Sequence, residues 1–342
     1  MELQTNNPRI PYTDPVATPG SGVSPESLAL HGATSAGDVS RVRTLLSSLP
    51  DGLRLPTSAA EYISQARFRS ATNDLQDASI VGNVEKIRSL LQAWRADPSL
   101  KDPTTDDMDM ALILAAQNAK GAAVRFFLDE GVPVSLTAPK LAARDGDGTV
   151  EVFQAFFDHG WDINSFDRIP AIHSATKSLP LTKWFLDHGA DPNLISKDGH
   201  TPIDFAVTHV SPNTPAIIDL LLSSGALLKD SNALHNALTT IESDDECKSM
   251  MEILINRGFD INALSFSNQP SFQERNLSTP LHWAVRKHCA RRGRRKMLVR
   301  IDWLLEHGAD LEIKDSKGRA PIDDASDEAL ISLLKHKVDI AS

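Results

Sequence analysis

Apolar residues recur along this chain with a helical period, in short segments of similar pattern. Within each segment they stand at positions i, i+3 and i+4, which places them on one face of a helix. The segments with the clearest pattern are Val42–Leu46, Ile87–Leu91, Ile217–Leu222 and Ile301–Leu305. The chain is therefore predicted to contain repeated amphipathic helices, each with one buried side.

A glycine follows most of these helices. Glycine has no Cβ, so it adopts the left-handed backbone conformation that commonly ends a helix. Successive glycines of this kind, here called stop glycines, are 29 to 50 residues apart. The stop glycines are Gly131, Gly160, Gly189, Gly225, Gly258 and Gly308.

A second recurring phrase precedes each of these helices. It is most complete in Thr279-Pro280-Leu281-His282, which Trp283 and Ala284 follow. The threonine hydroxyl can cap free helix amides, and proline at the first helical position has no amide hydrogen to lose. Related first-helix phrases begin at Leu30, Leu75, Leu112, Thr137, Ile172, Thr201, Leu234 and Ala320.

The paired phrases resemble the ankyrin repeat, whose period is about 33 residues. The resemblance covers roughly residues 25–338 and implies an all-α ankyrin-repeat solenoid of about eight to nine helix–turn–helix units with hairpin-like loops. We number the repeats one to nine in the order of their first helices. Small alanines let neighbouring first helices approach closely, and they stand at Ala33, Ala78, Ala115, Ala206 and Ala284.

Three domain ranges follow from the pattern. Residues 1–24 are rich in Pro, Gly, Ser and Thr without periodicity, which predicts a disordered tail. The repeat domain is expected over 25–338, with 339–342 as the C-terminal end. An extra helix is predicted over 58–70, between repeats one and two, and a closing helix over 327–335 with the polar outer side that a terminal cap needs.

Composition narrows the class of protein. The chain has 342 residues, a net charge of −10 and two cysteines. Negative charge argues against nucleic acid and anionic membranes as partners. Two cysteines suit a reducing compartment, and no secretion signal or bilayer-spanning apolar stretch is apparent. We expect a monomer in the cytoplasm, with the nucleus as the alternative.

Seven of the eleven histidines fall within the repeat pattern. In the ankyrin family the histidine of the Leu-His pair bonds neighbouring backbone, so the resemblance implies a structural role for His31, His173, His235 and His282. His159, His188 and His307 precede stop glycines, near helix C-termini where a cationic ring is favourable. The remaining histidines have no metal-ligand spacing, and no catalytic or phosphate-binding motif is present. We therefore expect neither a cofactor nor a metal.

A basic run at 286–296 stands out in this acidic chain. It includes the basic loop Arg291, Arg292, Arg294, Arg295 and Lys296. The run falls in the turn of repeat eight, and the same turn of repeat seven is acidic over 242–246. Mutual neutralisation of the two turns is the favoured interpretation, with a partner contact and nuclear import as alternatives. Cys247 and Cys289 lie in these turns, as free thiols or as a redox-linked pair.

Partners of ankyrin proteins usually bind the concave face, which is formed by hairpin tips and first helices. The variable positions of this face follow the first-helix core by one or two residues. The candidates for partner binding are Lys177, Phe205, Thr208, His209, Thr239, Trp283, Arg286 and Lys287.

The function favoured by the sequence is a non-enzymatic scaffold that binds another protein. An enzyme or enzyme accessory with a pocket in the C-terminal half is the first alternative, because insertions gather at 207–216, 239–249, 264–278 and 286–297. A nuclear regulatory factor that uses the basic loop is the second. The sequence leaves enzymatic activity open and favours its absence.

Leu281 offers a test of the repeat assignment. If it faces the core, Leu281→Ala should lower the free energy of unfolding by about 2–5 kcal/mol, since it removes buried methyl groups and leaves a cavity. Urea denaturation of the two chains measures the difference. A change near zero would contradict the register of repeat eight.

Overall fold

The computed structural model of the chain describes residues 29, 33, 39–47, 59–145, 150–265, 277–290 and 294–341. Every regular element among these residues is a helix, which confirms the all-α prediction. The chain divides into two compact parts, residues 1–111 and 112–342, with the boundary inside α5 (Thr105–Gln117). The tail predicted over 1–24 lies outside the described residues.

The first part contains α2 (Val39–Ser47), α3 (Ala59–Val81) and α4 (Val84–Ala96). Helix α3 packs against both of the others, and Phe68 meets Trp94 edge to face. The prediction of a separate helix over 58–70 is wrong, because α3 continues without a break into the first helix of repeat two. No glycine or proline stands between residues 70 and 75 to end it, and the Thr72 hydroxyl bonds to the Phe68 carbonyl inside the helix.

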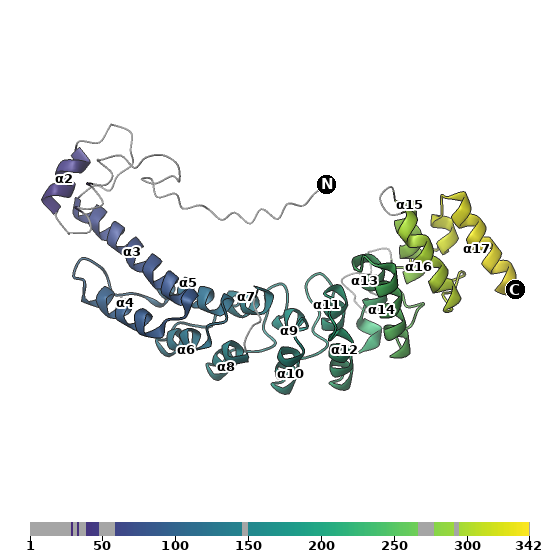
Figure 1. Cartoon of the computed structure of the whole chain (residues 1–342), viewed down its shortest axis with the longest axis horizontal. Helices are drawn as coiled ribbons and strands as arrows, with labels where there is room; N and C mark the ends of the chain where they lie inside the picture. Colours follow the sequence, from purple (N-terminus) through teal and green to yellow (C-terminus); the bar gives the residue numbers. More distant parts are fainter. Residues whose placement is uncertain are drawn as a thin grey trace. The chain divides into compact units, whose positions relative to one another are not determined.

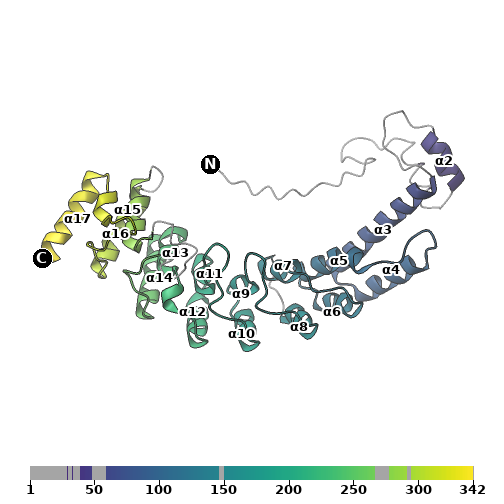
Figure 2. The same cartoon turned by 180° about the vertical axis from the view of Figure 1, so that it is seen from behind.

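The second part is a succession of helix pairs, which Figures 1 and 2 show from opposite sides. First helices pack on one another in chain order, α7 on α9, α9 on α11, α11 on α13 and α13 on α15. The first helices are α7 (Thr137–Asp145), α9 (Ala171–Ala175), α11 (Pro202–Thr208), α13 (Ala233–Thr240) and α15 (Pro280–Cys289). The second helices are α6 (Gly121–Asp129), α8 (Val150–Asp158), α10 (Leu179–Asp187), α12 (Thr214–Ser223), α14 (Asp244–Asn256) and α16 (Arg294–Glu306).

The predicted ends of these helices are confirmed. All six stop glycines have φ between +80° and +94°, a region that side chains with a Cβ rarely adopt. Thr201 and Thr279 cap α11 and α15, and each is followed by a proline in the first turn. The repeated alanines are buried where neighbouring first helices approach.

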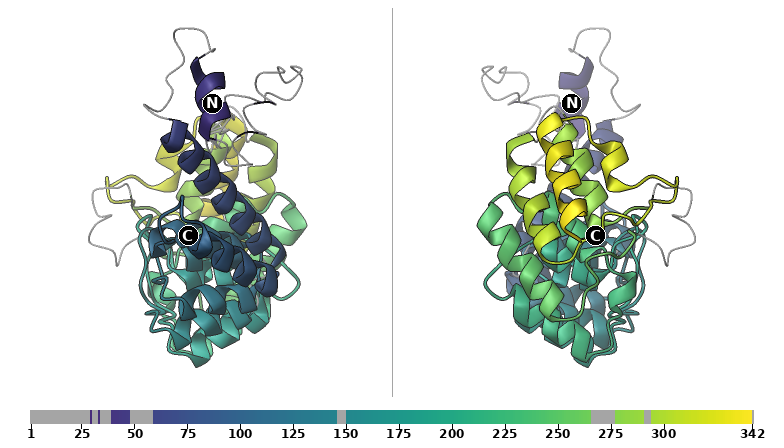
Figure 3. Two further views of the ribbon diagram at one scale, coloured as in Figure 1. Left: turned by 90° about the vertical axis from the view of Figure 1, so that its left-hand side faces the viewer. Right: turned by 90° about the vertical axis from the view of Figure 1, so that its right-hand side faces the viewer.

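Repeat nine is shortened, as the sequence predicts. Its first helix is reduced to a 3₁₀ turn, η3 (Pro321–Asp324), and α17 (Glu328–Ala341) follows. Helix α17 begins close to the predicted start at 327 and runs past the predicted end at 335. It lies at the C-terminal end of the second part, beyond α15 and α16 (Figure 3).

One buried cation ties repeat eight to repeat seven. Arg300 on α16 is 2% exposed, and its guanidinium donates to the Leu238 carbonyl at 2.7 Å and to the Glu242 carbonyl at 3.0 Å. It also pairs with Asp244 at 2.8 Å. Arg300 therefore bonds the C-terminal turn of α13 and holds the turn that leads into α14.

This arrangement predicts a large effect of Arg300→Met. Methionine keeps an unbranched apolar stem but leaves the Leu238 and Glu242 carbonyls without their donor, so the free energy of unfolding should fall by about 3–5 kcal/mol. Arg257 supplies the control, because it is half-buried and its partner Asp219 is 57% exposed. Arg257→Met should cost about 1 kcal/mol or less in the same urea titration. Equal losses would contradict the role given to Arg300.

Candidate functional site

The row of first helices is held by histidine side chains that reach the next repeat. His173, His235 and His282 each donate from Nε2 to a backbone carbonyl, over 2.8 to 2.9 Å. The acceptors are the carbonyls of His200, Ser278 and Arg319. Each of these residues directly precedes the first turn of the following repeat, so the predicted structural role of these histidines is confirmed. His31 lies outside the described residues.

Each acceptor carbonyl also receives the amide that closes its hairpin tip. The amide of Ser196 donates to the His200 carbonyl at 2.9 Å, and that of Asp315 donates to the Arg319 carbonyl at 2.8 Å. At Ser278 the donor is the Ser265 amide, which lies before the insertion. The histidine bond therefore fixes the base of a hairpin tip relative to the preceding helix.

Repeat six makes the same connection with a carboxylate. Asp204 stands at the position that His173, His235 and His282 occupy in repeats five, seven and eight, and it is fully buried. One carboxylate oxygen accepts from the Thr201 amide, and the other accepts from Ser231 and from the Asn232 amide, each at 2.7 Å. Burial raises the pKa of Asp204, while these hydrogen bonds act in the opposite direction. The junction between repeats six and seven thus uses an acceptor side chain, whereas the junctions after repeats five, seven and eight use a histidine donor.

A second set of connections, which the sequence analysis missed, lies beside the stop glycines. Asn164, Asn193 and Asn262 each follow a stop glycine by four residues. Each carboxamide donates to the carbonyl of the next stop glycine and accepts from the amide two residues beyond it. We call this pair of bonds the asparagine clamp. The recurring triplet Asp-x-Asn at 162–164, 191–193 and 260–262 is the signal that could have revealed it.

Each of the three histidines that precede stop glycines bonds to its own helix, and His159 also bonds to Asp129 of the preceding repeat at 3.0 Å. The Nδ1 atoms of His159, His188 and His307 donate to carbonyls four residues earlier, at 2.7 to 2.8 Å. The rings of His188 and His307 also stack on Trp184 and Trp303. Their predicted structural role is confirmed.

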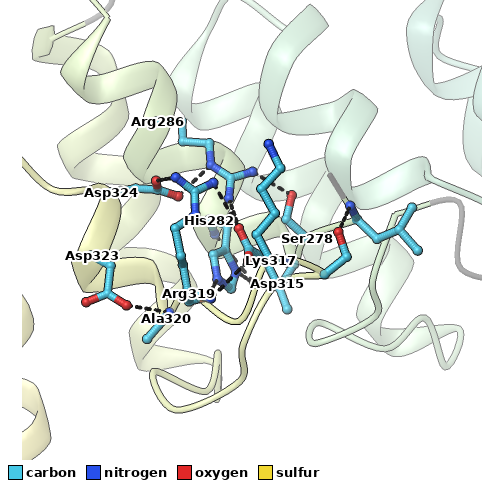
Figure 4. A network of polar contacts seen from close by, with 12 residues as sticks. Ser278, His282, Arg286, Asp315, Lys317, Arg319, Ala320, Asp323 and Asp324 are labelled. Carbon is cyan, nitrogen blue, oxygen red and sulfur yellow. Dashed lines mark hydrogen bonds and ion pairs between the residues drawn. The ribbon is translucent and has the colours of Figure 1, made fainter. Parts of the chain in front are cut away.

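Arg286 belongs to an internal network, although it is one of the predicted partner-binding residues (Figure 4). Its guanidinium pairs with Asp315 and Asp324 and donates to Ser278 at 3.0 Å. Arg319 pairs with the same two carboxylates. Two arginines and two aspartates therefore fasten repeat eight to repeat nine, and the positive charge of Arg286 is balanced within the chain.

The structure describes the acidic turn of repeat seven but not the side chains of the basic loop of repeat eight. The acidic turn of repeat seven bonds to Arg300, which lies outside the predicted basic run. Arg291 and Arg292 lie outside the described residues, as do the side chains of Arg294, Arg295 and Lys296. Their role as neutralising loop, partner contact or import signal stays a prediction.

The two cysteines are free thiols, as the simpler interpretation held. Cys247 is buried and donates to the Ala237 carbonyl at 3.4 Å, and burial raises its pKa to about 11. Cys289 accepts from the Ser326 amide at 3.3 Å. The Cys247 thiol is therefore protonated at neutral pH.

The other candidate residues stand at the ends of successive first helices. Lys177, Thr208, His209, Thr239 and Lys287 are exposed there, on α9, α11, α13 and α15 or just beyond them. The hydroxyls of Thr208 and Thr239 bond back to their own helices. We call these five residues the helix-end row.

The two aromatic candidates lie beneath this row and are half-buried. Phe205 stacks on His209. It also packs edge to face against the ring of His173, with the Phe205 and His173 centroids 4.8 Å apart. Trp283 packs edge to face against the ring of His235, with the two centroids 6.0 Å apart. Both aromatic side chains therefore pack against histidines that bond to the next repeat, and both are partly exposed.

A cavity of about 450 Å³ opens in the C-terminal half, where the enzyme alternative expects a pocket. Its walls include Leu228, Leu234, His235, Phe259 and Leu264. The Nε2 atom of His235 already donates to the Ser278 carbonyl, so this ring has a structural role in joining two repeats. A second hollow of about 380 Å³ lies between α6 and α8.

The residues that the structure describes hold no group of three or more His, Cys, Asp or Glu side chains arranged to bind a metal. Among the helices they form, none has both the length and the apolar character needed to cross a membrane.

Comparison with known families gives a direct match in repeat eight. Residues 276–316, which contain the Thr-Pro-Leu-His phrase and its stop glycine, match the ankyrin repeat model. This chain contains an ankyrin repeat at residues 276–316. Among solved structures, it is similar to the ankyrin repeat domain of Bcl-3, a member of the IκB family, at 20% identity and a TM-score of 0.40, over 77% of this chain and 97% of that one. The human ASB11 ankyrin repeat domain gives 17% identity and a TM-score of 0.39, over 77% and 96%.

His173, His235 and His282, the buried histidines that bond to the next repeat, predict that the stability of the protein depends on pH. Burial lowers the pKa of His173 and of His235 to about 4 and lowers that of His282 as well. The unfolded chain therefore binds more protons than the folded one between about pH 6.5 and pH 4. The free energy of unfolding is therefore highest above pH 6.5 and decreases as pH falls toward 4, by about 3 kcal/mol for each of His173 and His235.

Urea midpoints at pH 7.5, 6.0 and 5.0 measure this loss. The variant His173→Asn/His235→Asn removes both titrating rings, so its midpoint should depend less on pH than that of the unmodified chain. An unchanged pH dependence in the variant would assign the effect to other groups.

Proposed function

We propose that this protein is a non-enzymatic ankyrin-repeat scaffold that binds another protein through the helix-end row. The observation that carries the proposal is the exposure of one repeat position in three neighbouring repeats. Lys177, Thr208 and Thr239 each lie four residues after His173, Asp204 and His235, on or just beyond first helices that are otherwise largely buried. In repeat eight that position is Arg286, and the exposed Lys287 follows it.

The clamps make this row suitable for recognition. Histidine and asparagine bonds hold the backbone below it, so the exposed side chains are already in position before a partner arrives. Pre-positioned groups lose less conformational freedom on binding than mobile ones do. His209, stacked on Phe205, adds an aromatic contact of the kind that is enriched in protein interfaces.

The chemistry of the row also favours a protein partner. A lysine at each end encloses threonines and a histidine, a mixed polar surface without a strong single charge. Such variation at fixed steps fits a shaped protein surface, whereas nucleic acid would require a continuous basic stripe. The proposal includes an intracellular location, in the cytoplasm or nucleus, and a monomeric chain; the two free cysteines support the location.

Two large side chains in the row should abolish partner binding. Thr208→Arg/Thr239→Arg places bulk and charge on adjacent steps, so the protein captured from an extract by the unmodified chain should be lost. The matched control is Ser223→Arg/Glu252→Arg, which adds the same side chains at exposed positions of the second helices.

The measurement is quantitative affinity capture, followed by titration of the captured protein against all three chains. Far-UV circular dichroism establishes that each variant is folded. If both double variants retain the same partner with equal affinity, the helix-end row is not the binding surface.

A further inference from the structure

The junction between repeats six and seven lacks the asparagine clamp. The loop after Gly225 has Lys229 at the position where Asn164, Asn193 and Asn262 stand in the other loops. Leu227 likewise replaces the aspartate that precedes the clamp asparagine, and the segment Leu228–Asp230 forms the 3₁₀ turn η1. The next stop glycine is Gly258, which therefore receives no carboxamide from the preceding loop.

The backbone groups that a clamp would engage are nevertheless present at this junction. At the clamped stop glycines, the carboxamide bonds to the glycine carbonyl and to the amide two residues on, as with Gly189 and Asp191. The corresponding groups here are the carbonyl of Gly258 and the amide of Asp260. Gly258 has a φ of +91°, close to the values of +86°, +94° and +93° at Gly189, Gly225 and Gly308. In the described part of the chain, neither the Gly258 carbonyl nor the Asp260 amide makes a hydrogen bond.

A cavity opens at the same place. Gly258 and Asp260 both line the cavity of about 450 Å³, and so does Lys229. The remaining walls are largely apolar, with Leu228 and Phe259 among them. An apolar hollow with a few fixed polar groups is the usual form of a ligand site. Gly160 and Asp162 also receive no asparagine clamp, but they line neither cavity.

We infer that this cavity binds the side-chain carboxamide of an asparagine or glutamine presented by a partner protein. A primary carboxamide has one acceptor oxygen and a donor NH₂, which matches one amide and one carbonyl on adjacent backbone. A carboxylate cannot donate to the Gly258 carbonyl, and a hydroxyl cannot span both groups in this geometry. The chain itself uses this recognition in its three asparagine clamps.

This site is separate from the helix-end row. None of the cavity residues belongs to that row, so the inference stands whether or not the row binds a partner. The apolar walls favour a carboxamide that is flanked by apolar residues in the partner chain.

The test uses the full chain and the peptide acetyl-Leu-Asn-Leu-N-methylamide, which carries a single primary carboxamide. Its addition should move the amide NMR resonance of Asp260 in a saturable way. The Asp310 amide, already bonded to Asn262, should not respond. A control peptide with a dimethylated asparagine side chain keeps the acceptor but loses the donor, so it should bind at least about fivefold more weakly.

A variant that fills the site from within supplies the second arm. Leu227→Asp/Lys229→Asn rebuilds the Asp-x-Asn triplet at two positions that are exposed. It should slow hydrogen exchange of the Asp260 amide and lose the peptide response, while Lys229→Ala retains the response. The inference is overturned if the Asp260 resonance stays fixed up to the solubility limit of the peptide, if both peptides bind equally, or if the double variant responds as the unmodified chain does.

Discussion

The repeat architecture depends on a carbonyl that accepts two hydrogen bonds. In repeats six, eight and nine, the residue before the first turn receives the amide that closes its own hairpin tip and the imidazole of an earlier repeat. A helix pair cannot cover its apolar face alone, so it needs neighbours in a fixed register. The shared carbonyl sets that register, because the tip and the preceding helix are attached to the same atom. Lowered histidine pKa values are the electrostatic cost of placing these rings in the core.

Two arginines of repeat eight connect it to its neighbours through individual side-chain contacts. Each guanidinium bonds to backbone carbonyls or pairs with carboxylates of an adjacent repeat. Arg300 bonds two carbonyls and one aspartate of the preceding repeat. Arg286 shares two aspartates with Arg319. Because each guanidinium has fixed donor directions, such contacts define geometry as well as balance charge.

Local rules made much of the fold predictable, and non-local ones did not. Stop glycines, threonine caps and buried alanines depend on backbone conformation and helix period, which short stretches of sequence reveal. The fusion of two predicted helices into α3 depends on the absence of a breaker near residue 72. The helix-end row could be located by register, but the pairing of Arg286 could not, because its carboxylates lie 29 and 38 residues away. The asparagine clamp was visible as a triplet, although its bonding partners were not.

Asp204 has a mechanical consequence for the second part of the chain. The junction between repeats five and six and the junction between repeats seven and eight each have a histidine bond and an asparagine clamp. The junction between repeats six and seven has Asp204 and no asparagine clamp. The joint between repeats six and seven is held by the two hydrogen bonds that Asp204 accepts and by the Arg257–Asp219 pair, which connects the second helices instead of the loops. A load that pulls the loops apart should therefore meet less resistance here than at the two flanking joints.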